Sequence, residues 1–129
     1  MDTTTLLVIS PSTDLGASLR QLLPPSRFDV VHMLPGAGLL QGLRRIRPRI
    51  AVVDCIDHRP EAAQLEIALI KEMYPEAQII AVSANSSAAD VFVIEQGLFC
   101  YVAAPEDDEL VRIIHAAFLV ADAGAATKL

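Results

Sequence analysis

Five short, largely apolar runs are spaced along the chain, and most of them lack the polar–apolar alternation of a half-exposed strand. Runs of this kind are typical of strands that are buried on both faces of a parallel sheet. The sequence therefore predicts strands over residues 5–10, 28–33, 50–55, 78–83 and 99–103. Asp29 and His32 make the second run more polar, which places that strand nearer the sheet edge.

Between these runs, apolar residues recur at helical spacing, and capping residues or prolines mark the ends. The pattern predicts helices from residues 12–14 to Pro24, over 39–46, over 60–74, from 86 or 87 to 96, and over 107–121. Strict alternation of strand and helix favours right-handed crossovers and a parallel sheet with helices on both faces. We predict one α/β domain over residues 1–122, a doubly wound five-stranded sheet with five helices, followed by a tail or linker start at 123–129.

Composition and charge narrow the function classes. The 129 residues are 53% hydrophobic and 20% charged, which is enough for a domain to fold without disulfides or structural metal ions. Ten basic and sixteen acidic residues give a net charge of −6, which argues against direct nucleic-acid binding. The apolar runs are far short of the roughly 20 residues that cross a bilayer. Cys55 and Cys100 have no metal-ligand spacing, so we expect a reduced, cytoplasmic protein with no bound metal.

Candidate chemistry centres on Asp54, which ends the buried third strand. In open parallel sheets, ligands gather outside the carboxyl ends of the central strands. Asp54, Cys55, Asp57 and His58 are close in sequence, but a loop with a buried cysteine explains them better than a metal site. No glycine-rich phosphate cradle follows the first strand, and no nucleophile elbow surrounds Ser83. The sequence therefore indicates no catalytic residues.

The order of these elements resembles the receiver domains of two-component response regulators. The resemblance spans nearly the whole chain and includes the strand ending on Asp54, the run ending at Ser83, and residues 95–105. It implies the sheet order 2-1-3-4-5 and a phosphoryl group accepted by an aspartate from a histidine kinase. Asp54 matches that aspartate, Ser83 matches the hydroxyl residue that bonds the phosphoryl group, and Tyr101 matches the aromatic switch.

Three positions depart from the family pattern. Ser10 and Pro11 stand where the family has an acidic pair that holds Mg²⁺, and Ala104 stands where it has a lysine. Mg²⁺ needs several oxygen ligands, and phosphoryl transfer needs positive charge at the pocket. Asp14 or Asp57 can replace the missing acids only from a displaced loop, and helix capping or solvation explains both better. We expect Mg²⁺ as a cofactor only if Asp54 is a working phosphoacceptor.

Two groups of residues are candidate contact surfaces. Residues 91–94 are four consecutive apolar positions in a predicted helix, so they cannot all face one core. In receiver domains the face formed by the fourth helix, fifth strand and fifth helix serves dimerisation or docking, and Phe92, Phe99 and Tyr101 lie there. Arg44, Arg45, Arg47 and Arg49 surround the end of the second helix, where cations favour the helix dipole; they can also dock an acidic partner.

Two functions of different class follow. The first is a phosphorylation-independent interaction or dimerisation module, with a protein partner or a fused effector domain. The second is a phosphoacceptor that works through Asp54 and a rebuilt Mg²⁺ site. A third, weaker alternative is a small-molecule site in the remnant of the phosphate pocket.

Overall fold

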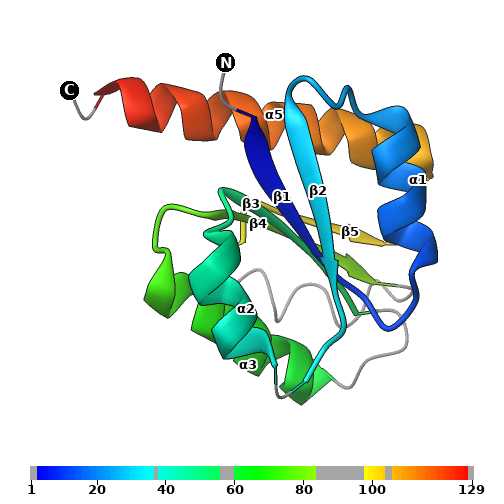
Figure 1. Cartoon of the computed structure of the whole chain (residues 1–129), viewed down its shortest axis with the longest axis vertical. Helices are drawn as coiled ribbons and strands as arrows, with labels where there is room; N and C mark the ends of the chain where they lie inside the picture. The colour runs from blue at the N-terminus through cyan, green and yellow to red at the C-terminus, as the bar shows by residue number, and fades with distance from the viewer. Residues whose placement is uncertain (1–2, 37, 56–59, 84–97, 104–105, 128–129) are drawn as a thin grey trace.

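A computed structural model describes residues 3–36, 38–55, 60–83, 98–103 and 106–127. The sheet has five parallel strands, β1 (Thr4–Ile9), β2 (Phe28–Met33), β3 (Ile50–Asp54), β4 (Gln78–Ser83) and β5 (Cys100–Ala103). Their order is β2-β1-β3-β4-β5, which confirms the predicted fold class and the edge position of β2 (Figure 1). The chain reverses its direction of winding beside β1, so β1 and β3 flank the point where ligand sites form in such sheets.

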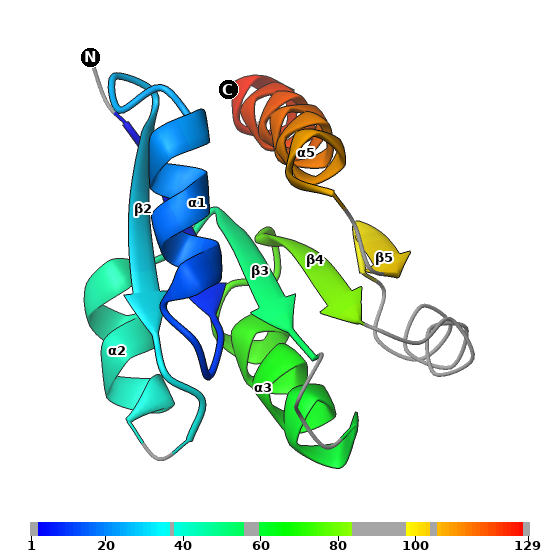
Figure 2. The same cartoon turned by 90° about the vertical axis from the view of Figure 1, so that its right-hand side faces the viewer.

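Four helices lie in the described ranges: α1 (Asp14–Leu22), α2 (Leu39–Ile46), α3 (Pro60–Met73) and α5 (Asp107–Thr127). α1 and α5 cover one face of the sheet, and α2 and α3 cover the other (Figure 2). The predicted helix ending at residue 96 lies outside the described residues. α5 continues past the predicted end at residue 121, because the segment that follows is rich in alanine, the strongest helix former.

Successive residues of the central strands point to opposite faces, so the core forms two layers. Leu6 and Val8 point toward α1 and α5, whereas Leu7 and Ile9 point toward α2 and α3. All four side chains are fully buried, which explains why β1 reads as a continuous apolar run. No helix within the described ranges is long and apolar enough to cross a membrane.

α2 ends in an unusual backbone conformation. Arg47 has φ 49° and ψ 64°, in the left-handed region, and its N–H donates to the carbonyl of Leu43. Glycine usually takes this position, because the left-handed conformation costs about 1–2 kcal/mol for other residues. The Tyr74 hydroxyl donates to the same Leu43 carbonyl at 2.6 Å, which ties the end of α3 to the end of α2.

Candidate functional site

The carboxyl ends of β1 and β3 bring Ser10 and Asp54 together. Ser10 follows β1 directly and is fully buried, and Asp54 ends β3 with 9% of its surface exposed. The Ser10 hydroxyl donates a hydrogen bond to Asp54 Oδ2 at 2.8 Å. This contact follows from the strand register, since Ile9 pairs with Val53 and places the next residues side by side. A buried, charge-assisted bond therefore occupies one oxygen of the candidate phosphoacceptor.

The backbone around Ser10 is held from two directions. The Ser10 N–H donates to the Met33 carbonyl at 3.1 Å, and His32 Nε2 donates to the Ser10 carbonyl at 2.9 Å. The Ser10 hydroxyl oxygen also accepts the N–H of Ser12 at 3.2 Å. Because β2 supplies two of these contacts, the edge strand fixes the position of the Ser10 side chain against Asp54.

Ser83 and Tyr101 come from the two strands beyond β3. Ser83 ends β4 and is buried, next to the Asp54–Val82 register pair of β3 and β4. Tyr101 is half-buried on β5, opposite Ala81, and packs against the core layer that contains α2 and α3. The fold thus brings Ser10, Asp54 and Ser83 to one edge of the sheet.

Of the remaining predicted positions, two lie at the rim of this site and three lie outside the described residues. Pro11 is exposed in the turn before α1, and Asp14 is exposed in the first turn of that helix. Ala104, Asp57 and His58 lie outside the described residues. An exposed carboxylate in the first helical turn favours the helix dipole, which accounts for Asp14 without a ligand role.

Cys55 lies directly after Asp54 and is buried. Burial, and to a smaller extent the nearby Asp54 and Glu66 carboxylates, together raise the pKa of its thiol to about 12. The thiol donates weakly to the Val53 carbonyl at 3.6 Å. A thiol protonated at neutral pH is a poor metal ligand and a poor nucleophile, so Cys55 behaves as a small core residue.

The donor set around Asp54 fits a cation poorly. Across residues 3–36, 38–55, 60–83, 98–103 and 106–127, no three His, Cys, Asp or Glu side chains form a group that could hold a metal ion. Mg²⁺ takes oxygen atoms that accept, whereas the Ser10 hydroxyl points its proton at the carboxylate. Among the described residues at this edge, Ser10 and Asp54 form a hydrogen-bonded pair.

The candidate contact residues differ in their surroundings. Phe99 is half-buried and packs against the layer of α1 and α5, whereas Tyr101 packs against the layer of α2 and α3. Residues two positions apart in one strand point to the same face. Phe99 and Tyr101 do not, because Phe99 lies before the start of β5. Phe92 lies outside the described residues.

Sequence reasoning missed the part played by His32, which was expected only as an edge-strand residue. Its ring reaches Ser10, at a separation of 22 positions, because Val8 and His32 are register partners in β1 and β2. Nothing in the local sequence signals this contact. The hydrogen-bonding role of Ser10 was equally hidden, since the sequence showed only a missing acid.

No model of a known protein family matches this chain, and no curated protein sequence matches it. Solved structures do match in fold. The signal receiver domain of a putative LuxO repressor protein from Vibrio parahaemolyticus has a TM-score of 0.82 at 18% identity, with 99% of each chain covered. A response regulator from Thermotoga maritima has a TM-score of 0.77 at 20% identity, with 90% of this chain and 98% of that chain covered.

A longer protein also matches. NtrX from Brucella abortus has a TM-score of 0.79 at 17% identity; the match covers 98% of this chain but 29% of NtrX. TM-scores of 0.77, 0.82 and 0.79 show that these three structures share the fold described above. This chain has the fold of a response-regulator receiver domain.

Proposed function

We propose that this chain is an atypical receiver domain of two-component-type signalling that acts as a phosphorylation-independent protein-interaction module. The observation that carries the proposal is the 2.8 Å hydrogen bond from the Ser10 hydroxyl to Asp54. In the receiver domains that this chain resembles, an acidic residue that binds Mg²⁺ stands at the position of Ser10. A donor in that position stabilises the Asp54 carboxylate within the fold and leaves a bound cation with too few oxygen ligands.

The absence of the family's lysine, which Ala104 replaces, supports the same conclusion. Ala104 brings no positive charge to the phosphoryl group, and Pro11 brings neither a carboxylate nor a backbone N–H to the loop. Without Mg²⁺ and without the lysine, little remains to offset the charge of a transferring phosphoryl group. Asp54 is then a structural residue of the β1–β3 edge.

The partner in this proposal is a protein or a fused effector domain, contacted in the cytoplasm. NtrX, of which the match covers only 29%, is an example of a longer chain that contains this fold. We place the contact, or a homodimer contact, on the face that includes Phe92, Phe99 and Tyr101. Phe99 and Tyr101 are only half-buried, and a partner would cover the remaining part of their aromatic side chains.

A specific observation favours one alternative, a working phosphoacceptor. Asp54 and Ser83 are both buried at neighbouring strand ends, the arrangement that the resemblance implies for phosphorylation. This alternative needs a Mg²⁺ site completed by residues outside the matched positions.

Beryllofluoride, which mimics a phosphoryl group on an aspartate, separates the two. We would titrate Mg²⁺ and beryllofluoride into the wild type and into Asp54→Asn and follow amide NMR shifts. The proposal expects no saturable response in either protein. A saturable response of the wild type alone, at Asp54, Ser83 and Tyr101, would establish the phosphoacceptor instead.

A rebuilt variant makes a negative result meaningful. Ser10→Asp, Pro11→Asp and Ala104→Lys together restore the residue types that the resemblance requires. If this variant retains its circular dichroism spectrum and gains a Mg²⁺-dependent response, the fold supports the chemistry and the natural residues remove it. If the rebuilt variant folds but shows no Mg²⁺-dependent NMR response, these three positions do not explain why the wild type fails to respond.

A further inference from the structure

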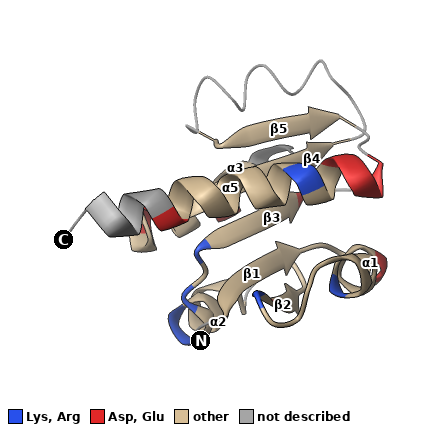
Figure 3. Ribbon diagram, turned by 90° about the horizontal axis from the view of Figure 1, so that it is seen from above, with Lys and Arg blue, Asp and Glu red and all other residues tan. Residues whose placement is uncertain are grey.

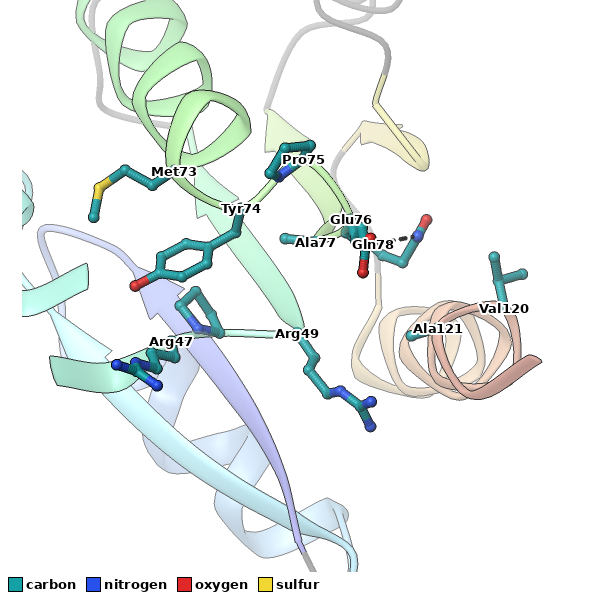
Figure 4. A pocket seen from close by; sticks show the side chains of 11 residues that line it. Arg47, Arg49, Met73, Tyr74, Pro75, Glu76, Ala77, Gln78, Val120 and Ala121 are labelled. Atoms are coloured by element: carbon teal, nitrogen blue, oxygen red, sulfur yellow. Dashed lines mark hydrogen bonds between the residues drawn. The ribbon is translucent and has the colours of Figure 1, made fainter. Parts of the chain in front are cut away.

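A cleft lies at the amino-terminal edge of the sheet, opposite the edge that holds Asp54 (Figure 4). We call it the basal cleft. Its volume is about 530 Å³, within the range of about 300–1,000 Å³ that is usual for small-molecule sites. It is lined by Arg47, Pro48, Arg49, Met73, Tyr74, Pro75, Glu76, Ala77, Gln78, Val120 and Ala121. The start of β3, the α3–β4 turn and α5 thus enclose it.

The walls of the basal cleft are largely apolar and are fixed in place. The Tyr74 hydroxyl is held by the Leu43 carbonyl at 2.6 Å, so the ring stands as a fixed wall. The Gln78 N–H donates to the Arg49 carbonyl at 2.9 Å, which holds the starts of β3 and β4 together. Opposite, α5 contributes Val120, an apolar side chain that is 49% exposed. A preformed apolar slot costs little to order when a ligand binds.

Positive charge borders this slot. Arg47 and Arg49 both line it, and within the described ranges no side chain or carbonyl pairs with either guanidinium. Glu76 is the acidic residue among the lining side chains, and it is engaged in an interaction of its own. Basic residues gather at the end of α2 and the start of β3, whereas acidic residues gather at the start of α5 (Figure 3). Two arginines and one glutamate thus line the cleft, which gives the lining a net positive charge.

Helix-end electrostatics do not account for both arginines. Cations in the last turn of α2 favour the helix dipole, but Arg49 lies beyond that helix and directly before β3. Arg47 occupies the left-handed position where glycine is usual, a conformation that stability alone would not select.

We propose that the basal cleft binds a small organic acid whose apolar ring lies between Tyr74 and Val120 and whose carboxylate pairs with Arg49. Guanidinium groups match carboxylates in geometry and remain charged at all physiological pH values. The apolar walls supply area for the ring, and Arg47 adds positive charge at the mouth. The site is separate from the Asp54 edge, so it stands whether or not Asp54 accepts a phosphoryl group.

Naphthylacetate is a suitable probe, because it joins a bicyclic apolar ring to one carboxylate. We would titrate it into the chain at pH 7 and follow amide NMR shifts. We expect saturable shifts at residues 47–49, 74–78 and 120–121, with a Kd of about 1 mM for a ligand of this size. Absence of saturation by about 10 mM, or saturable shifts elsewhere, would overturn the proposal.

Two matched ligands and two matched variants test the two halves of the site. Naphthylacetamide lacks the charge and acetate lacks the ring, and each should bind at least about tenfold more weakly. Arg49→Gln should weaken naphthylacetate binding about tenfold, whereas Arg112→Gln, an exposed arginine on α5 away from the cleft, should change it less than twofold. Equal weakening by the two variants would mean that net charge, not this cleft, attracts the probe.

Discussion

Replacing Ser10 by alanine should destabilise the fold by about 2 kcal/mol. The substitution removes the donor that lies 2.8 Å from Asp54 Oδ2, and Ser10 is fully buried, so water cannot replace the lost hydroxyl without rearrangement. Hydrogen bonds to charged groups contribute about 1.5–3 kcal/mol. For 129 residues, an unfolding entropy of about 2.1 cal/mol/K per residue converts 2 kcal/mol into a Tm decrease of about 7 °C.

Urea unfolding followed by circular dichroism at pH 7 would measure this loss, with an unchanged m-value. Ser26→Ala is the matched control, because Ser26 is exposed and its loss should stay within about 0.5 kcal/mol. A double-mutant cycle with Asp54→Ala isolates the pair, and we expect a coupling of at least about 1 kcal/mol. A loss below about 0.5 kcal/mol for Ser10→Ala, or additive single effects, would refute the reasoning.

Three further predictions can be checked by the same unfolding assay. Gly16→Ala should stabilise α1 by about 0.5–1 kcal/mol, because alanine loses less backbone entropy than glycine when it enters a helix. The site has room for the methyl group, since the new Cβ would lie 3.4 Å from His32 Cβ; a loss of stability would contradict this prediction. Tyr74→Phe should cost about 0.5–1.5 kcal/mol by removing one of the two hydrogen bonds that the Leu43 carbonyl accepts, and an unchanged stability would contradict this. The folded state raises the pKa of Cys55 from 9.0 to about 12, so above pH 9 the unfolded state binds fewer protons and stability should fall by up to about 1.4 kcal/mol per pH unit. Cys55→Ala should lose that slope, and parallel slopes would show that other groups cause it.

The apolar runs predicted the sheet well because burial on both faces leaves a direct record in the sequence. β3 and β4 appear as uninterrupted apolar stretches, and the strand order followed from the family resemblance. Boundaries were less accurate, since backbone pairing decides them. β1 begins at Thr4, whose N–H donates to the Arg27 carbonyl, and it ends at Ile9, one residue before the predicted end.

The candidate site was predictable in position but not in its contacts. The end of a buried central strand located Asp54 at the ligand-binding edge. Its partner Ser10 is 44 positions away, and only the register of two parallel strands brings the two together. The basal cleft was also beyond the sequence, because it joins three segments that are far apart along the chain.

The Ser10–Asp54 bond also bears on how a cation would bind. If Mg²⁺ takes the lone pair of Asp54 Oδ2 that accepts the Ser10 hydroxyl, this hydrogen bond is lost, and losing about 1.5–3 kcal/mol corresponds to roughly 10- to 150-fold in affinity. The stability and binding effects of Ser10→Ala should therefore have opposite signs: the variant is less stable, yet it binds Mg²⁺ at least as well as the wild type. Magnesium titrations followed by amide NMR would measure this. Weaker binding by Ser10→Ala would mean that the hydroxyl oxygen is itself a ligand, and the argument that Ser10 opposes a metal site would fail.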